Sequence, residues 1–516
     1  MRKNRILFLF FIHSLLGIAQ KNQTFEIYRY PSRFRISAEE LQMNGSEPNI
    51  AFVGHGYEIF GLSSKSPNTY FGVNSFSALT GIRSGFFVFG VTGGYQHQLF
   101  SDKFHYDLGF FIGGGGGSGT PDGGGLMLRP HIDLSYHISP KIALRTGMSY
   151  IRFPTGTIDS FNINLGLTFE ANTYIAEQTT LQIKETQKNY NYQPVELNVL
   201  SSNLLKFSKG PLKNSDTTSK NNQLISLLGA TIKIHRKNNF YGLIKLGGAF
   251  IGEVDGFAML LSGIGYQLSL TDWLNMNTQA SIGGAGGGNV AFGGGLAAQL
   301  DIGIGIKIKK YLFNINYGKT YAPNGNYQSN HLDVSLGKQF HLFNGSKEKH
   351  TIITGKNLAL EKFTFSLANR TYLLPNAIGK FGVPYQDAFS LINFELEKKM
   401  GARISALMTT NWAYLGDYGA YAEGWVGMQY TPFYHSEKKW NLSLRALLGA
   451  GGGGGLDLGS GMIYQYGITL EKKIHKRWSF VTGIGQVRPV FDGNFTPAFL
   501  DIGLKLNLNH LIKKEK

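Results

Sequence analysis

The feature that most constrains the fold of this chain is an internal repeat. A glycine block occurs three times, at residues 112–117, 282–287 and 448–453. A proline follows each block at nearly the same distance: Pro154, Pro323 and Pro489. The period of about 170 residues is far longer than the 20–50 residues of solenoids and propellers, so each copy has the size of a domain. We therefore expect three homologous units, residues 23–190, 191–358 and 359–516.

The first 19 residues have the pattern of a secretory signal. Arg2, Lys3 and Arg5 precede an apolar run over residues 6–18, which is the order found in cleaved signal peptides. The run is shorter than the roughly 20 residues that a membrane-spanning helix needs. We expect residues 1–19 to be removed during export, and any insertion into a membrane to use strands.

Each unit is expected to be all-β. Aromatic residues make up 13% of the chain, and runs with period-two alternation lie between turn signals, a pattern typical of strands. In the first unit the pattern predicts eight strands, at residues 25–37, 50–62, 69–78, 84–99, 103–115, 125–138, 141–153 and 159–170. Three such units would contain about 24 strands.

One strand in each unit shows the alternation most clearly, with apolar side chains such as Ile132 and Leu134 on one face and polar side chains on the other. The polar positions are Arg129, His131, Asp133, Ser135 and His137 in the first unit, Gln299 and Asp301 in the second, and Gln465 and Glu471 in the third. In a soluble sandwich the apolar face forms the core, whereas in a membrane barrel it meets lipid. In a barrel these polar residues would line the lumen.

The lengths of the links favour the barrel. In the first unit, the links after even-numbered strands are short and polar, as at Ser101-Asp102-Lys103 and Ser139-Pro140. The links after odd-numbered strands are longer on the whole, as at residues 38–49. Outer-membrane barrels combine short periplasmic turns with longer external loops. We therefore expect a transmembrane barrel, with a soluble secreted β-protein as the alternative.

The last strand carries a more specific pattern. Asp501 is followed by Gly503 and then by Leu506 and Leu508, and segments 164–171 and 335–342 have the same spacing. This resembles the terminal β-signal of Gram-negative outer-membrane β-barrel proteins. The resemblance implies location in the cell outer membrane, contact with outer-membrane lipid and recognition by the barrel insertion machinery.

Two architectures fit three units of eight strands. A single closed ring of about 24 strands would enclose a wide channel, whereas three tandem eight-stranded barrels would have filled interiors. The polar links at 171–193 and 341–360 favour separate units, but a closed ring is the usual product of hairpin duplication, and we favour the single barrel. A channel of that width would need a plug or a periplasmic partner protein to seal it.

The glycine blocks do not have the context of a nucleotide site. No Gly-Lys-Ser/Thr sequence follows any of them, and the strand–helix junction of a dinucleotide fingerprint is missing. Glycine permits sharp coiling of a sheet and close packing of bulky neighbours. The blocks are therefore expected to be structural, with a collar at an external rim as the alternative.

Signals for catalysis are weak. The chain has no Cys, which excludes Cys-ligated metal sites and a Cys nucleophile. His131, Asp133, Ser135 and His137 could form an acid–base or metal site, but the other two units do not repeat this set. The net charge of +17 comes without a nucleic-acid motif. We expect no cofactor and no nucleic acid, and favour a non-enzymatic channel or export conduit, with a surface structural or adhesive barrel displaying its glycine-rich loops, or an envelope-lipid hydrolase, as alternatives.

Overall fold

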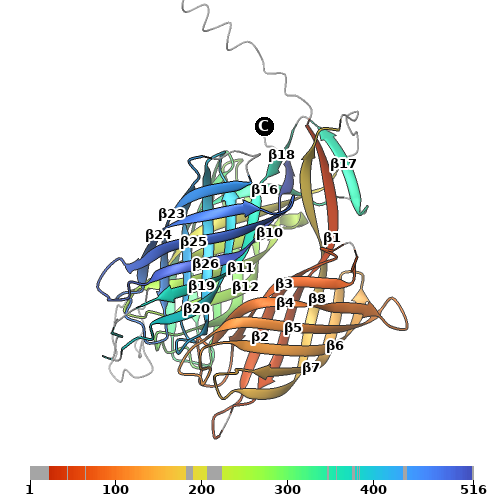
Figure 1. The fold of residues 1–516 in the computed structure, drawn as a ribbon. Coiled ribbons are helices and arrows are strands. Elements are labelled where there is room, and N and C mark those ends of the chain that lie inside the picture. The colour runs from red at the N-terminus through yellow and green to blue at the C-terminus, as the bar shows by residue number, and fades with distance from the viewer. Residues whose placement is uncertain are drawn as a thin grey trace, which may run out of the picture.

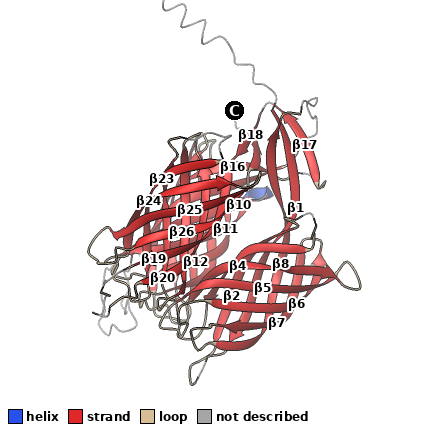
Figure 2. Cartoon of the chain, in the orientation of Figure 1, coloured by secondary structure: helices blue, strands red, loops and turns tan. Residues whose placement is uncertain are grey.

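The computed structural model shows a chain built almost wholly of strands (Figure 2). It describes residues 23–43, 45–63, 65–181, 190–205, 224–345, 348–355, 357–374, 378–379, 382, 384–433 and 439–513. The expected signal peptide, residues 1–19, lies outside them. Within these ranges the helix is a single 3-10 turn, η1 (Lys237–Asn239), and no helix is long and apolar enough to cross a bilayer.

The first eight strands close on themselves as an antiparallel ring, which we call barrel 1. They are β1 (Gln23–Leu41), β2 (Ile50–Phe60), β3 (Thr69–Ala78), β4 (Phe87–Gln98), β5 (Phe104–Gly116), β6 (Met127–Ser139), β7 (Ile142–Arg152) and β8 (Asp159–Thr179). Neighbouring strands pair in sequence order, and β8 returns to pair with β1 from Thr24↔Thr179 to Glu39↔Asn164. The alternation in the sequence predicts all eight strands, and most ends within about three residues.

A second ring, barrel 2, follows the same order. Its strands are β9 (Tyr192–Leu205), β10 (Leu224–His235), β11 (Phe240–Ile251), β12 (Ala258–Ser269), β13 (Leu274–Gly286), β14 (Leu296–Ile308), β15 (Tyr311–Tyr321) and β16 (Gln328–Phe343). The ring closes where β16 pairs with β9, from Asn330↔Leu205 to Phe343↔Tyr192.

The third ring, barrel 3, contains β19 (Phe363–Leu373), β20 (Ala388–Lys399), β21 (Ile404–Leu415), β22 (Ala422–Tyr430), β23 (Trp440–Gly452), β24 (Met462–Lys473), β25 (Trp478–Pro489) and β26 (Ala498–Asn507). It closes where β26 pairs with β19, from Thr364↔Asn507 to Leu373↔Ala498.

These pairings correct one expectation, because the strands do not form a single ring of about 24. The last strand of each unit pairs with the first strand of its own unit rather than with the next unit along the chain. The backbone hydrogen bonds that would join units into one wide barrel are therefore used within each unit. Figure 1 shows barrel 1 as a separate body beside the other two barrels, which overlap in this view.

Each barrel has two distinct ends. At one end the chain enters and leaves the barrel, and short links such as 140–141 and 309–310 join even-numbered strands of barrels 1 and 2 to the next strand. We call it the joining end. At the other end lie the glycine-rich links 117–126, 287–295 and 453–461. We call it the glycine end.

A small sandwich connects the three barrels at the joining end. The start of β1 and the end of β8 run beyond barrel 1, and β17 (His350–Gly355) pairs with β1. Opposite them, β27 (His510–Lys513) pairs with β16 and with β18 (Leu358–Glu361). The buried side chains between the two layers come from all three units: Phe25, Ile27, Tyr174, Ala176, Phe343, Ile353, Leu358 and Leu511. We call this cluster the end core.

The glycine blocks form the contacts between barrels at the glycine end. A Cβ on Gly114 of barrel 1 would lie 2.7 Å from the backbone oxygen of Trp412 in barrel 3. A Cβ on Gly294 of barrel 2 would lie 2.5 Å from Cα of Thr80 in barrel 1. A Cβ on Gly452 of barrel 3 would lie 1.9 Å from the backbone nitrogen of Gly256 in barrel 2. Only glycine lets the backbones approach this closely.

The same contact therefore occurs three times and closes a ring of barrels. In each case the glycine block of one barrel, or the link that follows it, packs on the link after the third strand of a neighbour or on a strand that flanks that link. Two hydrogen bonds support these contacts: Gly419 N–H donates to Gly123 O over 3.3 Å, and Asn324 Nδ2 donates to Leu79 O over 3.1 Å. The first block, 113–117, is buried, so it packs between barrels rather than being displayed as an exposed loop at the rim.

Candidate functional site

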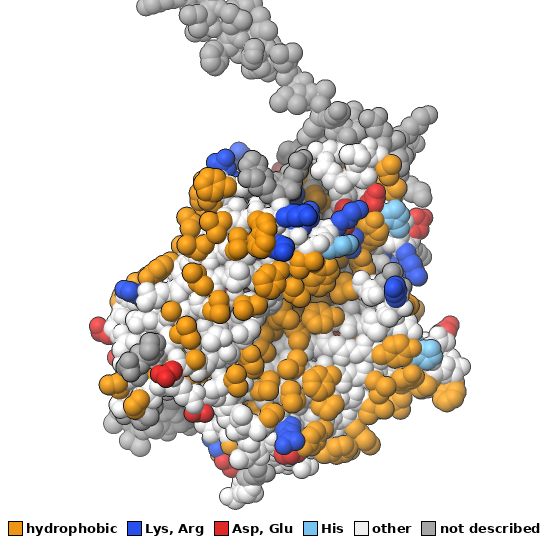
Figure 3. Space-filling view, in the orientation of Figure 1, with side chains coloured by type: hydrophobic (Ala, Val, Ile, Leu, Met, Phe, Trp, Pro, Cys, Tyr) orange, Lys and Arg blue, Asp and Glu red, His pale blue; other side chains and the backbone are white. Residues whose placement is uncertain are grey.

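The interiors of the barrels hold most of the buried charged side chains, so they are the first place to look for a site. Over much of their length the strands turn polar side chains inward and apolar side chains outward. Towards the glycine end each barrel also holds a buried apolar cluster, such as the one around Phe52 and Phe76 in barrel 1. In β6, Arg129, His131 and Asp133 are buried, whereas Ile132 is 50% exposed. In β14, Gln299 and Asp301 are buried, whereas Leu300 is 66% exposed. This polarity is the reverse of a soluble protein, and Figure 3 shows apolar side chains spread over the outer faces of the barrels.

Barrel 1 contains a network of ion pairs that crosses its interior. Arg33 of β1 pairs with Glu58 of β2, and its Nη2 lies 2.5 Å from Oδ2 of Asp107 on β5. Arg129 Nε donates to Oε1 of Glu39 over 2.7 Å. Because burying an unpaired charge is very costly, removing one partner of these pairs would strongly destabilise the barrel.

The histidine cluster that the sequence singles out belongs partly to this network. His131 Nε2 lies 3.4 Å from Asp107 Oδ1 and 3.6 Å from Asp133 Oδ2, and Asp133 also pairs with Arg145. Ser135 is buried on the same face. His137 lies nearer the joining end, with Nε2 3.5 Å from Oε1 of Glu170. The structure therefore places His131 and Asp133 together and His137 apart from them.

Barrel 2 has a different network in the same place. Lys245 of β11 pairs with Asp333 of β16, and its Nζ donates to Oε1 of Gln299 over 2.8 Å. Asp301 pairs with His331 and accepts a hydrogen bond of 2.6 Å from Gln279 Nε2. The sequence identifies Gln299 and Asp301 but not Lys245, His331 or Asp333. Their strands also alternate, and the inward parity of these residues is the signal that would have found them.

In barrel 3, two arginines are each held by a carboxylate in a two-pronged arrangement. Arg370 of β19 donates two hydrogen bonds of 2.8 Å to Asp501 of β26 and one of 2.7 Å to Gln465. Arg445 donates to both oxygens of Glu395 over 2.8 and 2.9 Å.

In the same barrel, Lys505 Nζ lies 2.9 Å from Glu397 and 3.5 Å from the partly exposed Glu471. The forked pairs of Arg370 with Asp501 and of Arg445 with Glu395 belong to the strongest class of polar contact in proteins. Barrel 3 is thus filled by the same kind of network as the other two.

Asp501 belongs both to the ion-pair network of barrel 3 and to the segment that the sequence predicts to be a terminal β-signal. The sequence places it in a terminal β-signal with Gly503, Leu506 and Leu508. In the structure Asp501, Gly503 and Leu506 belong to β26, the last strand of barrel 3, and Leu508 lies just beyond its end. Recognition of this segment by an insertion machinery stays a prediction.

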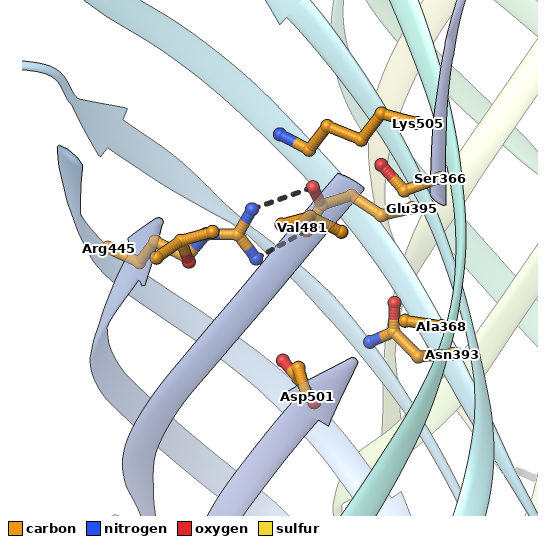
Figure 4. A pocket seen from close by; sticks show the side chains of 9 residues that line it. Ser366, Ala368, Asn393, Glu395, Arg445, Val481, Asp501 and Lys505 are labelled. Atoms are coloured by element: carbon orange, nitrogen blue, oxygen red, sulfur yellow. Dashed lines mark hydrogen bonds and ion pairs between the residues drawn. The ribbon is translucent and has the colours of Figure 1, made fainter. Parts of the chain in front are cut away.

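One small cavity lies within the network of barrel 3. It has a volume of about 10 Å³, room for about one water molecule. It is lined by Ser366, Ala368, Asn393, Glu395, Arg445, Thr469, Val481, Asp501 and Lys505. Figure 4 shows Arg445 and Glu395 joined across this space, with Lys505 and Asp501 on either side. The role of the polar faces as the lining of a water-filled channel stays a prediction.

Among the described residues, two carboxylate–histidine groups have donor atoms close enough for a metal ion. They are Asp107, His131 and Asp133 in barrel 1, and Asp301, His331 and Asp333 in barrel 2, with ligand atoms within 4.8 Å of one another. In both groups, carboxylates already face cationic side chains, such as Arg33 and Lys245. We interpret both groups as parts of the ion-pair networks, because the positive charges that a metal would bring are supplied by the chain itself.

The polarity and the closure of the strands define the class of protein. Closed rings that contain an even number of antiparallel strands, with an apolar exterior and a polar interior, are the architecture of outer-membrane β-barrels. This chain has that architecture.

Comparison with known proteins adds little to this. Neither a protein-family model nor a curated protein matches the chain. The chain is similar to the siderophore receptor PirA from Pseudomonas aeruginosa, at 9% identity and a TM-score of 0.28 over 92% of this chain and 80% of that one.

Two further solved structures have similar scores. They are OpdQ from P. aeruginosa, at 9% identity and a TM-score of 0.22 over 94% and 98% of the two chains, and OccAB4 from Acinetobacter baumannii, at 8% and 0.22 over 95% and 99%. TM-scores this low do not establish a shared topology, so the assignment rests on the strands of this chain.

Proposed function

We propose that this protein is a non-enzymatic structural protein of the outer membrane, in which three filled barrels form one membrane-embedded platform. The membrane location rests on the exposed apolar faces of the strands. Side chains such as Ile132, Leu300 and Ile302 are at least half exposed on every second position. In water this would be a large aggregation-prone surface, whereas in a bilayer it is the lipid-facing band.

The structural role rests on one observation: buried side chains, with ion pairs that cross the interior, fill the barrels. Arg33, Arg129 and Arg370 are each less than 2% exposed. Each contacts a residue on a strand that is not its neighbour in the ring: Asp107, Glu39 and Gln465, respectively. Eight-stranded barrels are just wide enough for side chains to fill. A platform of this kind anchors what is attached to it and does not conduct through its barrels.

The experiment that tests this is single-channel recording of the purified mature chain in a planar bilayer. We expect protein that shows heat-modifiable gel mobility, the sign of a folded barrel, but that gives no steady conductance. Large and steady conductance would contradict the structural role and establish an open channel. Heat-modifiable mobility is the control, because unfolded protein would also give no conductance.

A transport conduit is the second candidate, and the polar cavity of barrel 3 favours it. The cavity lies between Arg445 and Asp501, so movement of one forked pair would enlarge a space that is already polar. Conductance that appears only under an applied voltage, or only with an added periplasmic partner, would support a gated conduit. An envelope-lipid hydrolase has no such support, because His131 lies inside the network of barrel 1.

A further inference from the structure

The joining end carries exposed basic side chains around all three barrels, which we call the basic belt. They are Lys65, Lys103 and Lys141 on barrel 1, Arg236, Lys309 and Lys310 on barrel 2, and Arg403, Lys439, Lys472, Lys473 and Lys476 on barrel 3. In the described parts of the short links at this end, the exposed acidic side chains are Asp102, Asp272 and Glu348. The belt is therefore strongly positive, and it is spread over three separate barrels rather than gathered in one patch.

Exposed aromatic rings lie at the same level as the basic belt. They are Phe100, Phe104, Phe240, Trp273, Tyr311, Trp440 and Trp478, all in or next to links at the joining end. Lys472 Nζ lies 4.9 Å from the centre of the Trp440 ring, and Lys310 Nζ lies 5.7 Å from that of Tyr311. Aromatic rings at this position mark the boundary between hydrocarbon and headgroups in membrane proteins.

We propose that the joining end binds anionic phospholipid headgroups through the basic belt. The proposal rests on the membrane location argued above, and it adds which lipid is bound and at which end. A protein partner would contact one face of the molecule, whereas a lipid leaflet surrounds all three barrels, as the belt does. Lysines beside interfacial aromatic rings hold their charge at the depth of the phosphate groups, where each attracts an anionic surface.

The chain contains a built-in probe for this interaction. Trp273, Trp440 and Trp478 are exposed at the joining end, while Trp425 is buried. The protein is inserted into mixed vesicles of phosphatidylcholine and phosphatidylglycerol, in which one lipid or the other is brominated near the headgroup. Bromine quenches tryptophan fluorescence on contact. The ratio of quenching by the two brominated lipids reports which lipid surrounds the belt.

We expect brominated phosphatidylglycerol to quench about twofold more strongly than brominated phosphatidylcholine at equal mole fraction. The triple variant Lys310→Gln, Lys439→Gln and Lys472→Gln lowers this ratio towards about one. Salt at about 0.5 M lowers it as well, because it shortens the range of the attraction.

The matched control removes three exposed charges at or near the opposite end of the barrels, by Arg152→Gln, Lys319→Gln and Arg488→Gln. We expect it to keep the wild-type ratio. Equal quenching by the two lipids in the wild type, or an equal loss in both triple variants, would overturn the proposal. Quenching by neither lipid would mean that the chain does not insert, and would contradict the proposed membrane location itself.

Discussion

At the scale of single residues, the charged side chains inside the barrels are paired with opposite charges, because they are buried away from solvent. Arg129 pairs with Glu39, and Arg370 pairs with Asp501.

The carboxyl of Asp122, in the link between β5 and β6, forms no such ion pair with any of the described residues. Burial between barrels raises the pKa of Asp122 to about 7, against the opposing effects of the Gly117 N–H and the charge of Arg83.

This shift predicts a pH dependence with a definite sign. A raised pKa in the folded state means that the folded protein holds a proton that the unfolded chain releases. The contribution to stability is present below about pH 4 and is lost as the pH rises through about 7. We expect the temperature at which heat-modifiable mobility is lost to fall between pH 5 and pH 8, and Asp122→Asn to remove this part of the decrease.

The control for this prediction is Asp492→Asn, which changes an exposed carboxylate at the same end of the barrels. It should leave the slope against pH unchanged. An equal effect of both variants would show that the slope reflects the overall charge of the glycine end rather than the buried carboxyl of Asp122.

At the scale of elements, the strands that leave the barrels matter as much as those inside them. The sequence predicts the end of the eighth strand at residue 170, but β8 continues to Thr179. The alternation weakens there because Tyr174, Ile175 and Ala176 are all buried, so the segment has apolar contacts on both faces. Such a segment has no period-two signal, and only the end core shows that it is a strand.

The end core predicts that one aromatic ring holds the joining end together. Phe343 is buried against Tyr174, with ring centres 5.2 Å apart. We expect Phe343→Ala to lower the free energy of unfolding by about 3 kcal/mol, measured by guanidinium titration in detergent micelles. Phe491→Ala, at an exposed position on the glycine end, should cost far less. A negligible effect of Phe343→Ala would mean that the sandwich is not part of the cooperative unit.

At the scale of the whole molecule, the three barrels form a closed ring through one kind of contact. Gly294 meets Thr80, and Gly452 meets Gly256. At Gly125 the backbone also has a positive φ of 87°, which a larger residue would adopt only with strain. A side chain at any of these positions would push two barrels apart without touching the interior of either.

Gly294→Val is therefore expected to separate barrels 1 and 2 at the glycine end while both stay folded. The chain has no Cys, so Arg152→Cys and Lys319→Cys place one spin label on each barrel. We expect Gly294→Val to lengthen and broaden the distance between the labels, with heat-modifiable mobility retained. Gly424→Ala, which meets no atom within 4 Å, is the matched control. An unchanged distance would show that the glycine contact does not hold the ring.

The sequence alone determined the strands, their polarity and the repeat, because period-two alternation and turn residues act over a few neighbouring positions. It located Arg129, His131 and Asp133 on an inward face for the same reason. The common descent of the units and the cleaved signal stay predictions from the sequence.

Only the tertiary structure decided how the strands close. A strand such as β8 offers the same edge to β1 of its own unit as to the next unit, and the alternation is identical in both cases. The pairing partner depends on contacts between residues far apart in the chain, as at Thr24↔Thr179. The role of the glycine blocks as contacts between barrels was likewise decided by the tertiary structure. Glycine permits close approach of a backbone, but the sequence does not say which backbone approaches.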